Sequence, residues 1–222
     1  MKLIYFAGGN RLDTLKAVNN IDGIEINKIC TTSIEPNIDK YRNFAYEKNI
    51  KFEVFSKKNI EELFSKTDEE ILLSVGYRFI IPSNVFNKFK YAINIHPSLL
   101  PKYKGAYSGF AIIENGENET GITAHFIDSG IDTGDIIQQV VIPLTKVDTI
   151  NSMSQKVSNI EANFVSDVIK NIIDNNFKVQ KQINSDNIIY NKKRLPEDSF
   201  IDPNKPLIEL YNKIRSCDQE NY

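Results

Sequence analysis

Residues 3–18, Leu-Ile-Tyr-Phe-Ala-Gly-Gly-Asn-Arg-Leu-Asp-Thr-Leu-Lys-Ala-Val, hold the pattern that decides the fold. The apolar run from Leu3 to Ala7 predicts a buried strand, and the two glycines after it predict a sharp turn. In residues 10–18 the apolar positions recur at three-residue steps and therefore share one face of a helix. The same alternation of strand and helix continues through the first 145 residues. It predicts an α/β fold whose mostly parallel, twisted sheet is flanked by helices.

The rest of the chain divides into further expected elements. Apolar runs predict strands at residues 24–31, 52–55, 71–75, 92–95, 122–127 and 136–142. Amphipathic stretches predict helices at 38–48 and 60–65, and a long helix capped by Thr149 that reaches Ile172. Prolines and polar residues increase after residue 175, before a short amphipathic helix around 207–214. We therefore expect one domain at residues 1–175 and a C-terminal extension at 176–222.

The composition of the 222-residue chain excludes several classes of protein. Hydrophobic residues make up 41% and charged residues 25%, as in ordinary globular chains, and a net charge of -2 gives no general attraction to nucleic acid. The N-terminal apolar run is too short for a signal peptide or a membrane span, so we expect a cytoplasmic protein without a membrane partner. Two cysteines far apart and two histidines do not match a zinc pattern, so no metal is expected.

The loops that follow strands are the places to look for a site, because ligands of open α/β sheets bind at the carboxyl ends of the strands. The first such loop, residues 8–11, has two glycines that open a helix and could hold a phosphate on its N–H groups. It matches neither the three-glycine dinucleotide fingerprint nor the loop that ends in Gly-Lys-Ser/Thr. The alternative interpretation is a tight turn between strand and helix.

The most informative stretch is Tyr-Ala-Ile-Asn-Ile-His-Pro-Ser-Leu-Leu-Pro, residues 91–101. Asn94 and His96 are two apart on an expected strand, so their side chains project from the same face. An amide beside an imidazole can stabilise a developing oxyanion and move a proton, which are the two requirements of acyl transfer. The alternative is a histidine that only satisfies a buried hydrogen bond, and the same alternative applies to His125.

Three carboxylates occur in the glycine-bearing loop at residues 128–135. Asp128, Asp132 or Asp135 could orient His96 and raise its basicity, and the spacing does not select one of them. Acidic residues in such loops also cap turns. A calcium site is not supported, because the EF-hand spacing and its closing glutamate are absent.

Two separated motifs resemble the formyltransferase family that uses N10-formyltetrahydrofolate. That family carries Asn-x-His followed by Ser-Leu-Leu-Pro, and later an Asp-x-Gly loop with an essential aspartate. Here the motifs are Asn-Ile-His-Pro-Ser-Leu-Leu-Pro at 94–101 and Ile-Asp-Thr-Gly-Asp at 131–135, with Gly-Ile-Thr-Ala-His-Phe at 121–126 between them. The resemblance covers at least residues 71–173 and implies a Rossmann-like fold.

The resemblance also implies roles for individual residues. His96 would be the general base, Asn94 would donate to the formyl oxygen, and Asp132 would orient His96 and favour its protonated form. The folate that donates the formyl group is expected against Arg78, Phe79, Ile80, Val85, Ile127, Asp128, Ser129 and Ile131. Sugar or phosphate contacts are expected from Asn10, Lys102, Tyr103 and Tyr107.

The C-terminal extension favours one branch of that family. Residues 192–202, Lys-Lys-Arg-Leu-Pro-Glu-Asp-Ser-Phe-Ile-Asp, and the helix after them resemble the linker of enzymes that formylate amino sugars. The resemblance therefore implies transfer to the 3- or 4-amino group of a nucleotide-linked deoxyamino sugar, such as dTDP-4-amino-4,6-dideoxyglucose, by a homodimer.

Three alternatives remain. Glycinamide ribonucleotide formyltransferases have about this core length and a partly similar first loop, but they lack the extension. The tRNA enzymes carry a further basic C-terminal barrel, for which a slightly acidic chain of 222 residues is not expected to have room. A non-catalytic folate-binding module would not need His96.

Overall fold

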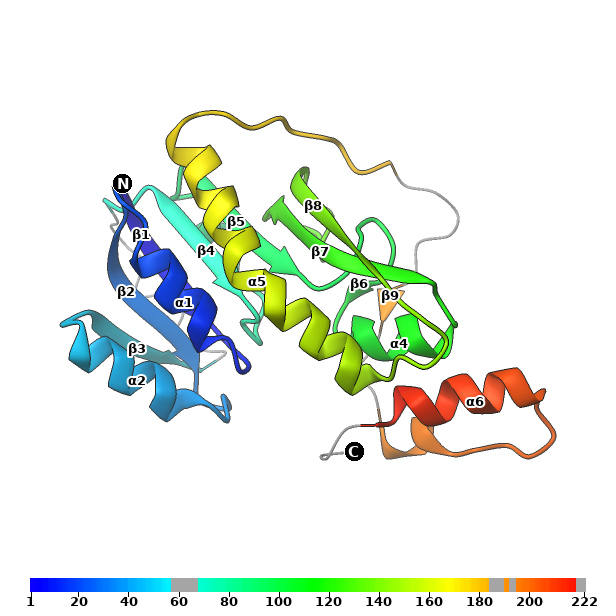
Figure 1. Ribbon diagram of the computed structural model, residues 1–222. Helices are drawn as coiled ribbons and strands as arrows, with labels where there is room; N and C mark the ends of the chain where they lie inside the picture. Colours follow the sequence, from blue (N-terminus) through cyan, green and yellow to red (C-terminus); the bar gives the residue numbers. More distant parts are fainter. Residues whose placement is uncertain (57–67, 184–189, 192–194, 219–222) are drawn as a thin grey trace.

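The computed structural model describes residues 1–56, 68–183, 190–191 and 195–218. Its centre is a seven-stranded sheet in the order β3-β2-β1-β4-β5-β7-β8 (Figure 1). The strands are β1 (Lys2–Ala7), β2 (Glu25–Thr32), β3 (Lys51–Phe55), β4 (Ile71–Val75), β5 (Tyr91–His96), β7 (Glu119–Phe126) and β8 (Ile136–Pro143). The first five pair in parallel, and β7 and β8 are antiparallel. The predicted α/β fold with a mostly parallel sheet is confirmed.

Helices flank the sheet, and one further helix lies in the C-terminal extension. They are α1 (Leu12–Asn19), α2 (Ile38–Glu47), α3 (Ser83–Phe86), α4 (Ser108–Glu114), α5 (Ile150–Ile173) and α6 (Leu207–Ser216), with a 3₁₀ turn at Pro196–Ser199. A small second sheet pairs β6 (Lys104–Gly105) with β9 (Tyr190–Asn191). The expected helix at 60–65 and the first residues of the 192–202 motif lie outside the described residues. In the part of the chain that is described, no helix has the length and apolarity to span a membrane.

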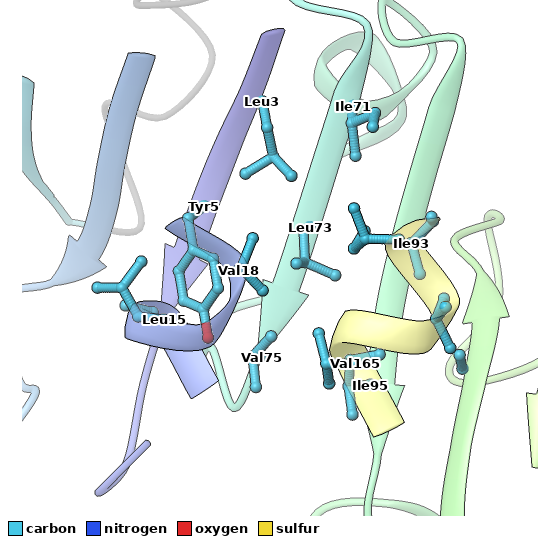
Figure 2. Packing of buried hydrophobic residues seen from close by; sticks show 14 of the residues in the cluster. Leu3, Tyr5, Leu15, Val18, Ile71, Leu73, Val75, Ile93, Ile95 and Val165 are labelled. Carbon is cyan, nitrogen blue, oxygen red and sulfur yellow. The ribbon is translucent and has the colours of Figure 1, made fainter. Parts of the chain in front are cut away.

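The two faces of the sheet carry separate apolar cores, because successive strand residues point to opposite sides. Leu3 and Tyr5 of β1 belong to the larger core, which also contains Val165 of α5 (Figure 2). Ile4 and Phe6 belong to a second core on the other face. Each fully buried side chain of this size stabilises the fold by roughly 1.5–3 kcal/mol, so both faces contribute.

Helix α5 anchors the first loop from the same face of the sheet as α1. It begins at a capping box, in which Thr149 Oγ1 accepts the Ser152 N–H and Ser152 Oγ accepts the Thr149 N–H, so the expected cap is confirmed. Further along, the buried carboxylate of Glu161 pairs with Arg11 and accepts from Thr14 Oγ1 at 2.8 Å. The ion pair and hydrogen bond fasten the start of α1 to α5, which lie side by side in Figure 1.

The chain direction across the sheet reverses next to β1, between the β2 side and the β4 side. The loops after β1 and β4 meet there, and the Gly8 N–H donates to the Val75 carbonyl at 3.0 Å. A Cβ at Gly8 would lie 2.0 Å from the Gly76 carbonyl oxygen, so only glycine permits this approach. Ligands of such sheets bind in the crevice at this reversal point.

The segment after α5 returns to the sheet. Gln180 pairs with Ile136 at the start of β8, and further along α6 packs beside α4 (Figure 1). Arg215 of α6 is buried and donates to the carbonyl oxygens of Asp148 and Ile113. The expected boundary at residue 175 stays a prediction. The first residues after it pack against the sheet, as Gln180 does.

Candidate active site

Strand pairing places three polar side chains on one face of the sheet. Asn94 and His96 alternate along β5, and the antiparallel register sets His125 of β7 directly opposite Asn94. The Nδ2 of Asn94 lies 3.1 Å from Nε2 of His125. Both histidines are buried, with His125 only 3% exposed. The chain contains two histidines in total, and the fold brings both to this place.

Asp132 joins these groups. Its Oδ2 lies 3.3 Å from His96 Nδ1, and its Oδ1 lies 3.4 Å from His125 Nε2 and 3.3 Å from Asn94 Nδ2. The Gly105 N–H also donates to Oδ2, at 2.8 Å. One largely buried carboxylate therefore accepts from an amide and a backbone N–H and lies next to two imidazoles.

The loop that carries Asp132 closes tightly. Asp132 has a φ of 52°, in the left-handed region that residues other than glycine rarely occupy. A Cβ at Gly134 would lie 1.8 Å from the Phe126 carbonyl oxygen, and the Phe126 N–H donates to the Asp135 carbonyl at 2.9 Å. The glycine of the Asp-x-Gly motif is therefore required by close approach of the two ends of the loop.

Acceptor chemistry assigns the proton positions on both rings. His96 Nε2 lies 2.8 Å from the Tyr103 carbonyl oxygen and must donate to it, so Nδ1 is the basic atom and faces Asp132. His125 Nδ1 lies 2.8 Å from the Phe126 carbonyl oxygen and donates there, which leaves Nε2 as the acceptor for Asn94. The basic nitrogen of His96 is thus already next to the carboxylate that would stabilise its protonated form.

The titration of the pair follows from burial and charge. Burial lowers the pKa of His96 and outweighs the opposing effect of Asp132. Burial alone raises the pKa of Asp132, but the neighbouring imidazoles of His125 and His96 and the hydrogen bond from the Gly105 N–H overcome it and lower that pKa to about 2. At neutral pH a neutral His96 therefore faces an ionised carboxylate, which is the state of a base ready to accept a proton.

The residues expected to contact the amine substrate are not all free to do so. The Tyr103 phenol donates to Glu117 at 2.6 Å and Tyr103 is 3% exposed, so its backbone carbonyl, at His96, is its contribution to the site. Lys102 is exposed, and Tyr107 has a φ of 59° just before α4. Substrate contacts by the side chains of Lys102 and Tyr107 stay predictions.

The first loop is occupied by the chain itself. The Gly9 N–H donates to Oε2 of Glu35 at 3.0 Å, and Arg78 Nε pairs with the same oxygen at 2.9 Å. The Glu35 side chain is 0% exposed. Asn10 Oδ1 accepts from Lys40 Nζ at 2.9 Å. A carboxylate already holds the N–H that a phosphate would use, which favours the interpretation of this loop as a tight turn.

The residues expected around the folate lie on the loop after β4, in α3 and on the loop after β7, next to the second core. Val85 is buried in that core, and Ile127 packs against it. Ile80 is 78% exposed and free to contact a ligand. Asp128 accepts from the Gly130 N–H and from Thr133, so its carboxylate shapes the loop. The other expected contacts lie on the same loops and stay predictions: Phe79, Ser129 and Ile131.

Sequence reasoning did not select three residues that the structure places at or beside the site. The role of His125 was left open, although it lies in one of the motifs. Glu35 and Gln182 carry no motif signal, because their contacts with Gly9 and with the Asp132 loop join segments far apart in the sequence.

The chain is similar to several known proteins. A family model described as formyl transferase matches residues 26–169. The methionyl-tRNA formyltransferase of Ehrlichia ruminantium is 36% identical over 164 residues, 72% of this chain, and the chain spans 52% of it. The trifunctional purine biosynthetic protein adenosine-3 of Chironomus tentans is 42% identical over 93 residues, which are 41% of this chain and 7% of that protein.

A solved structure resembles nearly the whole chain. The sugar 3N-formyl transferase WlaRD, solved with dTDP and 5-N-formyl-THF, is 29% identical with a TM-score of 0.79. The similarity covers 97% of this chain and 78% of that one. It therefore extends beyond the matched family region into the C-terminal extension.

Proposed function

Because this chain belongs to the formyl transferase family, we propose that it transfers a formyl group from N10-formyltetrahydrofolate to the amino group of a nucleotide-linked deoxyamino sugar. The observation that carries the proposal is the largely buried group of Asn94, His96, His125 and Asp132, which sets a neutral imidazole against an ionised carboxylate. The sugar nucleotide we favour is dTDP-4-amino-4,6-dideoxyglucose or a related 3- or 4-amino sugar, since WlaRD, a sugar 3N-formyl transferase, resembles the chain over 97% of its length.

The residues of the chain divide the work of formyl transfer. The folate supplies the formyl carbon to the attacking amine. His96 accepts at Nδ1 the proton that the amine loses as the new C–N bond forms, and returns a proton to the nitrogen that leaves. Asp132 stabilises His96 in its charged form and holds the ring in place, 3.3 Å away. Such a base contributes typically 10² to 10⁴ in rate.

Asn94 faces the place where negative charge develops. Its Nδ2 hydrogens point to His125 Nε2 and Asp132 Oδ1, at 3.1 and 3.3 Å. Donation to the formyl oxygen requires exchange of one of these partners, and we assign the longer contact, to Asp132. Loss of one such donor typically costs about 10² to 10³ in rate.

The loops fit a folate. A flat pterin with polar edges needs apolar walls and backbone hydrogen bonds. Ile80 supplies an exposed apolar side chain, and Ile127, beside Val85, begins the loop that leads to Asp132. We place the donor there, so that its reactive end reaches Asn94 and His96.

Glu35 supports an amino sugar over glycinamide ribonucleotide as the acceptor. The acceptor of the alternative enzyme carries a phosphomonoester, and the first helix N-terminus of an α/β sheet is a common site for such a group. Here Glu35 accepts hydrogen bonds from Asn37 and Gly9 N–H groups and from Arg78, which together lower its pKa although burial alone raises it. An ionised carboxylate at this position repels a phosphate.

The remaining alternatives receive less support. A net charge of -2 does not favour tRNA as substrate. A folate-binding module without activity would not require a buried base paired with a carboxylate. We further propose a cytoplasmic homodimer that binds the nucleotide sugar and neither nucleic acid nor a membrane.

Turnover with matched acceptors tests the proposal. The purified protein is supplied with N10-formyltetrahydrofolate and, separately, dTDP-4-amino-4,6-dideoxyglucose, the 3-amino isomer, and glycinamide ribonucleotide. We expect formylation of an amino sugar, loss of it in His96→Ala by at least about 100-fold, and folate affinity within a few fold of wild type. Faster turnover of glycinamide ribonucleotide, or full activity of His96→Ala, refutes the proposal.

A further inference from the structure

Gln182, nine residues beyond the end of α5, touches the backbone of the Asp132 loop. Its Nε2 donates to the Asp132 carbonyl oxygen at 3.0 Å and to the Gly134 carbonyl oxygen at 2.7 Å. The reverse orientation of the amide would set its own oxygen against two carbonyl oxygens, so the chemistry assigns Nε2 to this position. One side chain from the C-terminal extension therefore bridges two carbonyl groups on either side of Thr133.

The extension holds Gln182 in place. The ring of Phe177 packs edge-on against Tyr91 and Phe126, with centroids 6.0 and 6.2 Å apart. Gln180 and Ile136 then exchange backbone hydrogen bonds of 2.8 and 2.9 Å. Because Ile136 directly follows the Asp132 loop, this pairing fixes the extension and the end of the loop to each other.

The Asp132 loop requires such a fastening. Asp132 occupies the left-handed region with a φ of 52°, which a residue with a Cβ adopts only when its surroundings hold it there. A rotation of its backbone would swing the carboxylate away from His96 Nδ1 and from the Gly105 N–H. The carbonyl group that Gln182 holds belongs to this same residue, so its hydrogen bond resists that rotation.

We propose that Gln182 is a positioning residue, whose amide holds the backbone of Asp132 so that its carboxylate reaches His96. The inference concerns the site described above, and its effect on turnover rests on the proposed function. The pKa of His96 does not depend on that function, because it follows from burial and from the distance between Nδ1 and Oδ2.

The charged groups around His96 are few. Asp132 favours its protonated form, whereas His125 and Arg11 oppose it. Lys104 and Asp128 lie close enough to each other to interact, and Lys104 also interacts with Asp132. Gln182 carries no charge, so its replacement by a neutral residue alters His96 through the position of Asp132.

Histidine titration by NMR tests the proposal without any substrate. The chain has two histidines, and a His125→Gln variant assigns the His96 resonance. An opposite charge at this distance typically raises the pKa of a base by about 1 to 3 units. Asp132→Asn removes that charge completely, so it gives the largest fall expected in the pKa of His96. We expect Gln182→Met to lower the pKa of His96 by at least about a third of that fall. Gln180→Met, an exposed glutamine that pairs through its backbone, is the matched control and should leave the pKa unchanged.

Turnover provides an independent readout. We expect Gln182→Met to lower kcat about tenfold with little change in KM, and to have almost no further effect in an Asp132→Asn background, because both changes act through one carboxylate. Gln182→Asn, which keeps the amide one methylene shorter, should fall between wild type and Gln182→Met, and it replaces Gln182→Met if that variant does not fold.

The outcomes separate the two proposals. A shifted pKa of His96 in a protein that formylates no amino sugar supports the role of Gln182 and refutes the proposed substrate. An unchanged pKa of His96 in folded Gln182→Met or Gln182→Asn, or additive losses of kcat with Asp132→Asn, overturns the role of Gln182.

Discussion

Replacement of Asp132 by asparagine keeps the size of the side chain and removes its charge. The pKa of Asp132 falls from an ordinary value of 3.8 to about 2, so the native state favours the charged form by about 2 kcal/mol. A carboxyl group whose pKa is lower in the folded state stabilises the fold at pH values above its pKa in the unfolded state. This stability is lost as the pH falls towards the pKa of the folded state. About 1 kcal/mol of it is lost between about pH 5 and pH 3, and about 2 kcal/mol by about pH 2.

Urea unfolding of both proteins between pH 5 and pH 3 measures this loss. We expect the difference in unfolding free energy, wild type minus Asp132→Asn, to fall by about 1 kcal/mol as the pH drops from 5 to 3. Asp135→Asn is the matched control, since among the described residues no ion pair of Asp135 is found. Parallel curves for wild type and Asp132→Asn would falsify the assignment of an ionised, stabilising carboxylate.

Three further perturbations test other parts of the structure. Glu35→Gln removes the charge that fills the first loop, so we expect inorganic phosphate to inhibit this variant and not the wild type; equal inhibition of both contradicts the role of Glu35. Gly8→Ala should lower the unfolding free energy by roughly 1–3 kcal/mol, because its Cβ would lie 2.0 Å from the Gly76 carbonyl oxygen. Gly23→Ala should lower it by less, because its Cβ would meet no atom within 4 Å and only its positive φ is unfavourable. Arg215→Met should raise hydrogen exchange in α6 while leaving β5 protected, and equal exchange in α6 would show that its buried guanidinium does not hold the helix.

The period of the apolar residues was enough to predict most elements of the sheet and its helices. Strand β1 is a continuous apolar run, which is typical of a strand buried on both faces. In helix α5 the apolar residues recur every three to four positions, which gives one buried face. The short helix α4 was not predicted, because seven residues that include a glycine show too little periodicity. The packing of α6 on α4 also had no local signal, since Arg215 finds its carbonyl partners about 67 and 102 residues earlier.

Part of the candidate site was likewise predictable from local sequence, and part was not. Alternation along one strand was enough to place Asn94 and His96 on one face, because that geometry is a property of a strand alone. The contact of Asp132 with His96, the proton positions on the rings, and the approach of His125 depend on how β5, β7 and the 128–135 loop pack together. The spacing of Asp128, Asp132 and Asp135 in the sequence did not show which of them contacts His96.

The sequence by itself determined the kind of fold, the two motifs and the residue types available for formyl transfer. Tertiary structure alone decided that Glu35 fills the first loop and that Gln182 holds the Asp132 backbone. The physical reason is that local pattern controls which face of an element is buried. Hydrogen bonds between residues 26 and 50 positions apart depend instead on where separate elements meet.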